Sequence, residues 1–185
     1  DERLKIMKLH SAKILSLGLY FLMTLFSFSC KVDKKKVLID ENELKERLMD
    51  ANKNLLRSEF HLIDSFVNAH NYQLNETGSG LRYEIVKKTQ GKQAEAGDEV
   101  MIRYKSYFLN GETVQKGSTG QPEKVKLGEA KLIRGLEEVL LLMREGEVAR
   151  LVVPSHLAFG IRGDGESVPP AAILYYEINL MAIKK

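Results

Sequence analysis

The densest pattern of hydrophobic positions lies between Leu127 and Gly160. Six apolar residues recur there with the spacing of one helical face, namely Leu132, Ile133, Leu136, Val139, Leu140 and Met143. We expect this helix to stop at Gly146, in the left-handed conformation that ends many helices. From Glu147 to Val153 the period changes and β-branched residues appear, which indicates a strand ended by Pro154. Because so short a helix is marginal alone in water, we expect it to lie against a sheet.

Alternating apolar and polar residues predict that the rest of the C-terminal part is mostly β. Val100 to Leu109 alternates and then meets Asn110-Gly111, a strong hairpin signal. The return strand starts at Thr113, is interrupted, and resumes from Glu123 to Leu127, which indicates a bulge. Ala172 to Ile183 is the expected closing strand. We therefore expect an α+β fold, in which one short helix crosses a curved antiparallel half-barrel sheet of about four to six strands.

The residues from Asp40 to Asn71 include neither glycine nor proline and predict one long helix or two shorter ones. Its apolar residues fall near three-and-four spacing: Leu44, Leu48, Ala51, Leu55, Leu62 and Phe66. This stripe can pack on the following domain or pair with a second copy in a homodimer, and the pattern does not decide between them. The turn-rich stretch Asn75 to Gly80 ends the helical pattern. We expect a helical segment over 40–77 and the β domain over 78–185.

The N-terminal residues have the pattern of a secretory signal peptide. Ile14 to Ser29 is uncharged and mostly apolar, and three lysines precede it. The run is shorter than the roughly 20 residues that a membrane-spanning helix needs. This length favours a cleaved signal over 1–29, with a short signal anchor as the alternative. The lysine-rich stretch 30–39 is then a solvated tether.

Composition and charge narrow the function classes. The 185 residues are 44% hydrophobic, which is enough for a globular core. The formal net charge of +3 is too small to indicate nucleic-acid binding. The histidines have no cysteine or carboxylate neighbours at metal-ligand spacing, so we expect no metal site. These histidines are His10, His61, His70 and His156.

A series of motifs follows in order along the C-terminal part of the chain: Val100-Met101-Ile102-Arg103-Tyr104, Val125-Lys126-Leu127-Gly128, Leu132-Ile133-Arg134-Gly135-Leu136-Glu137, Val153-Pro154, Leu157-Ala158-Phe159-Gly160 and Val168-Pro169-Pro170. Over about Gly78 to Lys185 the series resembles the FKBP-type peptidyl-prolyl cis-trans isomerases. The resemblance implies the half-barrel fold and isomerase activity on proline-containing polypeptides. It implies no cofactor.

The resemblance also assigns an apolar proline pocket. Leu132, Ile133 and Leu136 form its floor, where the backbone N–H of Ile133 donates a hydrogen bond to a substrate carbonyl, and Phe159 overhangs its rim. The candidate catalytic residues are Tyr104, Ile133, Phe159 and Tyr176. The candidate substrate-binding residues are Val114, Gln115, Val125, Leu132, Leu136 and Val168.

Five positions depart from the family's pattern. Leu136 stands where active members usually carry tryptophan, Phe159 where a tyrosine hydroxyl usually bonds the ligand, and Gln115 where an aspartate usually faces a pocket tyrosine. Val114 and Glu123 replace two aromatic walls. The pocket stays apolar at its floor but is less aromatic and less polarised. Two interpretations stay open: an isomerase that assists protein folding, and a peptide-binding or chaperone module of the same fold with little or no catalysis.

The stretch Phe26-Ser27-Phe28-Ser29-Cys30 resembles a bacterial lipoprotein processing site, in which a small residue precedes an acylated cysteine. Ser29 fits this pattern and Phe28 departs from it. The resemblance implies that Cys30 becomes a lipid-anchored N-terminus, because two or three acyl chains hold a protein on a membrane stably. We therefore expect a protein of the bacterial cell envelope, facing the periplasm or the cell surface, that acts on secreted polypeptides.

Overall fold

The computed structural model describes residues 40–114 and 121–184 of the chain. The expected signal peptide 1–29, the tether 30–39 with Cys30, and Gln115 lie outside the described residues. The elements within them are, in chain order, α2 (Glu41–Ala69), β1 (Asn75–Glu76), β2 (Arg82–Lys87), β3 (Glu99–Phe108), β4 (Glu123–Lys126), α3 (Arg134–Leu142), β5 (Val148–Val153), the short 3-10 helices η1 (Ser155–Leu157) and η2 (Gly160–Arg162), and β6 (Leu174–Lys184).

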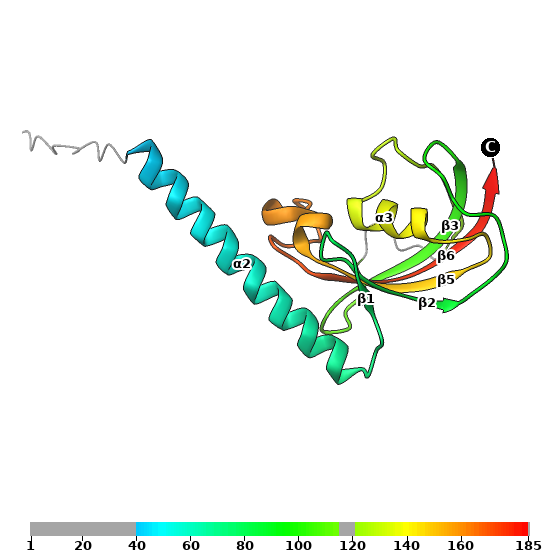
Figure 1. Ribbon diagram of the computed structural model, residues 1–185, viewed down its shortest axis with the longest axis horizontal. Coiled ribbons are helices and arrows are strands. Elements are labelled where there is room, and N and C mark those ends of the chain that lie inside the picture. Colours follow the sequence, from blue (N-terminus) through cyan, green and yellow to red (C-terminus); the bar gives the residue numbers. More distant parts are fainter. Residues whose placement is uncertain (1–39, 115–120, 185) are drawn as a thin grey trace, which may run out of the picture. The chain divides into compact units, whose positions relative to one another are not determined.

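In the described part of the chain, six strands form one antiparallel sheet in the order β1-β2-β5-β6-β3-β4. β3 pairs with β6 along its length, with an irregularity between Met101 and Ile102. The return strand predicted after Asn110-Gly111 starts as a bridge between Tyr107 and Thr113, and pairing resumes where β4 meets the start of β3. Figure 1 shows α3 lying over the curved sheet. The predicted α+β fold with one short crossing helix is confirmed.

The helix α3 is shorter than the apolar pattern predicts. Ile133 is its N-cap residue, and the helix ends before Met143. The prediction that Gly146 stops the helix is therefore wrong. Met143 is fully buried, and its backbone is already extended, with φ −94° and ψ 157°. Gly146, at φ 84°, instead belongs to the turn before β5, in which the Glu147 N–H donates to the Arg144 carbonyl.

One hydrophobic core fills the space between α3 and the sheet. Alternate strand residues point into it, as the sequence pattern predicts, and α3 adds Leu136, Val139 and Leu140, none more than 2% exposed. Burial of each such side chain contributes about 1.5–3 kcal/mol. Gly135 lets the start of α3 approach β5 closely, because a Cβ at this position would lie 2.6 Å from Cγ1 of Val153. The glycine therefore sets how near the helix lies to the sheet.

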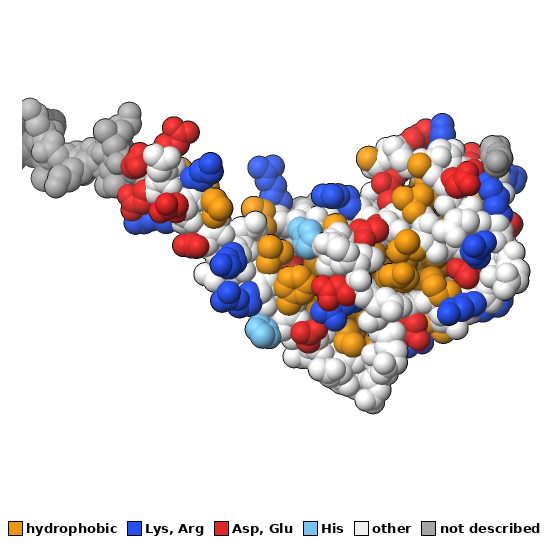
Figure 2. Space-filling model, in the orientation of Figure 1, with side chains coloured by type: hydrophobic (Ala, Val, Ile, Leu, Met, Phe, Trp, Pro, Cys, Tyr) orange, Lys and Arg blue, Asp and Glu red, His pale blue; other side chains and the backbone are white. Residues whose placement is uncertain are grey.

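The N-terminal α2 is one continuous helix, which settles the choice between one helix and two. Its C-terminal part packs on the other face of the sheet, where the fully buried Ile63 joins a cluster with Val152 and Tyr175. Part of the apolar stripe predicted for this helix is exposed to solvent: Leu48 is 61% and Leu62 is 56% exposed. Figure 2 shows hydrophobic side chains among charged ones along this helix. No helix of the described ranges has the length and apolarity that crossing a membrane requires.

We predict that Gly135→Ala destabilises the domain, although alanine is the better helix former by about 1 kcal/mol. The added methyl group would meet the buried Val153 side chain at 2.6 Å, and such overpacking costs about 1–3 kcal/mol. Thermal unfolding followed by circular dichroism measures the change. Gly78→Ala is the matched control, because a Cβ there would meet no atom within 4 Å. Equal melting temperatures for the two variants would contradict the prediction.

Candidate functional site

The structure brings the residues of the predicted pocket together. Nine of the ten belong to the core cluster around α3, and the tenth, Gln115, lies outside the described residues. The nine come from β3, β4, α3, β6 and the loops that join these elements. They are Tyr104, Val114, Val125, Leu132, Ile133, Leu136, Phe159, Val168 and Tyr176. We call this group the α3 site.

Exposure divides the α3 site into a support and a contact surface. The support consists of side chains that are at most 4% exposed: Val114, Val125, Leu136, Val168 and Tyr176. The contact surface consists of the half-buried residues Tyr104, Leu132, Ile133 and Phe159. A ligand can therefore touch two aliphatic side chains, one phenol and one phenyl ring.

Ile133 offers both an apolar side chain and a backbone donor. As the N-cap residue of α3 it has φ −64° and ψ 150°, and its carbonyl accepts hydrogen bonds from the N–H groups of Leu136 and Glu137. Its own N–H is one of the groups at a helix start that have no partner within the helix. No described residue accepts a backbone hydrogen bond from it. The start of α3 thus adds a backbone hydrogen-bond donor to the apolar α3 site.

Two tyrosines form a wall of the α3 site. The ring centroids of Tyr104 and Tyr176 are 5.9 Å apart, and the rings are tilted by 51°. Burial, the largest cause, raises the pKa of Tyr104 to about 12. Burial also raises the pKa of Tyr176 far above its ordinary value, with a smaller contribution from Tyr104. Both phenols are therefore neutral at physiological pH.

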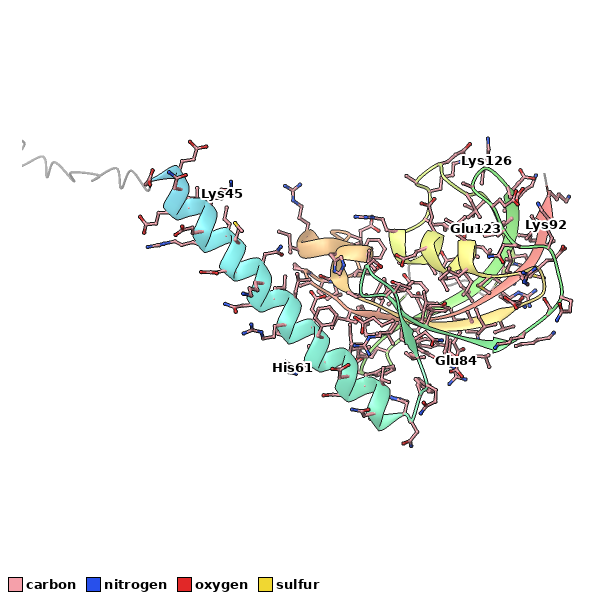
Figure 3. The ribbon with its side chains drawn as sticks, in the orientation of Figure 1. Lys45, His61, Glu84, Lys92, Glu123 and Lys126 are labelled. Atoms are coloured by element: carbon pink, nitrogen blue, oxygen red, sulfur yellow. The ribbon has the colours of Figure 1, made fainter. Side chains whose placement is uncertain are left out.

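Glu123 is the second cause of the raised pKa of Tyr104, after burial. Its negative charge and the hydrogen bond that it accepts from the Tyr104 hydroxyl also raise the pKa of Tyr104. The register explains the contact, because Glu123, labelled in Figure 3, begins β4 opposite Ile102. It therefore points to the same face of the sheet as Ile102 and Tyr104. Position-by-position reasoning treated Glu123 only as a lost aromatic wall. Its alternation with Val125 on the returning strand was the signal that could have revealed this carboxylate.

The connection between β5 and β6 carries Phe159 and Val168. The carboxylate of Asp164 organises its second half by accepting hydrogen bonds from the N–H groups of Val168, Ser167 and Glu166, at 2.7, 2.9 and 3.0 Å. These bonds, that of Val168 first, hold the pKa of Asp164 well below its ordinary value. A carboxylate that stays charged thus holds one supporting residue of the site in place.

A hollow on the other face of the sheet was not found by sequence reasoning. Its volume is about 410 Å³, and it lies between the end of α2, the turn after β3 and the start of β6. The rings of Tyr72 and Tyr175 stack with centroids 6.0 Å apart, and the guanidinium of Arg150 lies 4.4 Å from the Tyr72 centroid. These rings come from separate elements, so no local pattern predicts the hollow. Among residues 40–114 and 121–184, no group of three His, Cys, Asp or Glu residues could hold a metal ion.

We predict that Glu123→Gln lowers the pKa of Tyr104 but leaves it above the ordinary value of about 10. The variant removes the negative charge that opposes ionisation, whereas burial, the larger cause, remains. A pH titration of 13Cζ-labelled tyrosines by NMR measures the shift. Glu129→Gln makes the same charge change at an exposed ion pair with Lys126 and Lys131 and serves as control. An unchanged Tyr104 titration in Glu123→Gln would show that the carboxylate does not act on this phenol.

Comparisons with known proteins match the part of the chain that contains the α3 site. The family model described as FKBP-type peptidyl-prolyl cis-trans isomerase matches residues 90–181. The chain is 33% identical, over 116 residues, to the FKBP-type 22 kDa peptidyl-prolyl cis-trans isomerase of Escherichia coli, covering 63% of this chain and 56% of that protein. It is 31% identical, over 105 residues, to an FK506-binding protein of Neisseria meningitidis, covering 56% of this chain and 96% of that protein.

A solved structure has a similar fold. The crystal structure of a peptidyl-prolyl cis-trans isomerase from Pseudomonas syringae superposes with a TM-score of 0.59 at 25% identity, covering 72% of this chain and 96% of that one. The chain spans about half the length of several curated relatives, such as 43% of a peptidyl-prolyl cis-trans isomerase of Bos taurus and 56% of the Escherichia coli protein.

Proposed function

Because the chain belongs to the FKBP-type peptidyl-prolyl cis-trans isomerase family, we propose that it isomerises X–Pro bonds of polypeptides at the α3 site. The observation that carries the proposal is the gathering of half-buried apolar side chains, Leu132 and Phe159 among them, in the cluster that holds the Ile133 donor. Proline-containing polypeptides are the proposed substrates. Rotation about a bond transfers no group, so the reaction calls for neither a metal nor a cofactor.

The site would act on the rotation barrier of the amide. This barrier is about 18–20 kcal/mol, because resonance gives the C–N bond partial double-bond character. As the amide twists, it loses this resonance and much of its carbonyl dipole. An apolar site therefore favours the twisted amide over the planar one, which water solvates better. Such preferential binding of the twisted form lowers the barrier without a covalent step.

Each group of residues has a proposed part in this mechanism. The Ile133 N–H donates to a carbonyl next to the proline and orients the substrate chain. Leu132 and Phe159 contact the proline ring, and the neutral phenols of Tyr104 and Tyr176 wall the site. Buried side chains that hold these groups in place complete the site: Val114, Val125, Leu136 and Val168. Gln115, which lies outside the described residues, stays a proposed substrate-binding residue.

A peptide-binding module with little catalysis is the second candidate function. Phe159 favours it, because a phenyl ring cannot donate the hydrogen bond that a tyrosine would give to a ligand carbonyl. A hydrogen bond of this kind is worth about 0.5–1.5 kcal/mol, a factor of roughly two to twelve in rate or affinity. The hydroxyl of Tyr104 is also engaged by Glu123. The α3 site would then bind proline-containing peptides but isomerise them slowly or not at all.

We predict that the protein accelerates cis-trans exchange of a proline peptide above the spontaneous rate, and that Phe159→Tyr raises kcat/KM by about two- to tenfold. The added hydroxyl would supply the missing donor at the rim. A protease-coupled proline-peptide assay measures both effects, and a melting curve confirms that the variant is folded. No acceleration by the protein, together with measurable peptide binding, would favour the binding module over the isomerase.

The proposed location is the bacterial cell envelope, with a lipid anchor on Cys30. The motif before this cysteine supports the proposal, and the clients would then be secreted polypeptides whose folding the protein assists. We predict that Cys30→Ser moves the protein from the membrane fraction to the soluble fraction of fractionated cells, because the acylated residue is lost. An unchanged membrane fraction would contradict the anchor.

The exposed stripe of α2 supports a further proposal, a homodimer through the helix of 40–71. Leu48 and Leu62, about four helical turns apart, leave large apolar side chains in solvent. We predict that Leu48→Lys shifts the chain from dimer to monomer in sedimentation experiments. Asn54→Lys adds the same charge to an exposed position of the helix outside this stripe and should leave the dimer intact. A monomer before any substitution would rule the dimer out.

A further inference from the structure

The helix α2 carries a buried carboxylate, that of Glu59, which hydrogen bonds to a residue of the segment after β5. Glu59 is only 3% exposed. Its Oε2 accepts a hydrogen bond from the Ser155 N–H at 3.0 Å, and its Oε1 accepts one from the Ser155 Oγ at 2.5 Å. Ser155 is itself 2% exposed. Both carboxylate oxygens thus bind one residue, 96 positions further along the chain.

Ser155 is the first residue of the segment that leads to the α3 site. It begins η1, with one residue between it and the end of β5, and the N-cap residue of η1, Pro154, supplies no capping hydrogen bond from its side chain. The Leu157 N–H donates to the Pro154 carbonyl, and the Ala158 N–H donates to the Ser155 carbonyl. The next residue is Phe159, part of the contact surface. Glu59 therefore takes the place of the missing cap and fixes the start of a five-residue path to the site.

Docking of α2 on the sheet does not by itself call for a carboxylate. The neighbouring turn of the helix already packs Ile63 into an apolar cluster, and Asp64 forms an ion pair with Arg82 at the surface. A buried charge is costly to remove from water unless it is hydrogen bonded. An apolar residue at position 59 would fill the space without that cost. The pair of bonds to Ser155 is what the carboxylate adds.

We propose that Glu59 is a positioning residue for the α3 site: through Ser155 and η1, it holds the Phe159 rim in the conformation that contacts the substrate. The proposal rests on the proposed function, since it assigns Phe159 to substrate contact. The proposal gives α2 a role in positioning the site, although this helix lies outside residues 90–181 that the family model matches.

The test compares Glu59→Ala, Glu59→Gln and Ser155→Ala in the full chain, solubilised in detergent. Hydrogen exchange of the Leu157 and Ala158 amides reports on the rim without any ligand, and NMR titration with a short proline peptide gives the dissociation constant. Asp64→Asn is the matched control, because it removes a carboxylate from the same helix and breaks only the surface pair with Arg82. If Glu59→Ala does not fold, Glu59→Gln and Ser155→Ala carry the same comparison.

We expect Glu59→Ala to speed exchange at Leu157 and Ala158 by about tenfold or more, the factor that loss of one charge-assisted hydrogen bond produces. Peptide binding should weaken by about three- to tenfold, Glu59→Gln should recover part of both effects, and Asp64→Asn should match the unsubstituted protein. Unchanged exchange at these amides, or exchange that rises equally throughout the domain, would overturn the proposal. Faster exchange with unchanged peptide affinity would overturn the link to the site. If the unsubstituted protein binds no peptide, the proposed function fails, and exchange alone decides whether Glu59 holds the rim.

Discussion

The burial of α3 against the sheet is the interaction on which the rest of the structure depends. A helix of nine residues is marginal alone in water, so it exists because Leu136, Val139 and Leu140 are withdrawn from solvent by the sheet. The contact also creates the site. Close approach at Gly135 brings the first turn of the helix down onto β5, and the donor N–H of Ile133 then lies at the border of the apolar core. A change that loosens the helix therefore alters the site as well.

Three carboxylates add polar contacts to residues at or next to the α3 site. Glu123 binds the hydroxyl of Tyr104, and Asp164 gathers the backbone around Val168. Glu59 reaches across from α2 to Ser155. Asp164 and Glu59 accept hydrogen bonds from segments outside the strands, whereas Glu123 acts on a side chain of β3. The site thus combines an apolar contact surface with carboxylates that come from elements distant in sequence.

The sequence predicts the longer strands and the existence of α3, because burial of one face imposes a period that can be counted along the chain. It also predicts the nine residues that meet in the α3 site. It does not predict β1, a two-residue strand within the stretch Asn75 to Gly80, whose pattern indicates a turn. The sequence does not predict the features that tertiary contacts determine. The helix ends at Leu142 and not at Gly146, and cross-strand register places Glu123 on the face of the sheet that carries Tyr104. No local pattern contains either feature. The bond between Glu59 and Ser155 joins residues too far apart for any spacing argument.

The central claim is that the α3 site binds X–Pro segments, with the Ile133 N–H as donor to a substrate carbonyl. NMR titration of the 15N-labelled protein with a short proline peptide tests it most directly. We predict that the Ile133 amide shows the downfield shift of a new hydrogen bond, and that other large changes are confined to residues around Leu132, Tyr104 and Phe159. Peptide binding with no change at Ile133, and with shifts centred instead on the aromatic hollow around Tyr72, would contradict it.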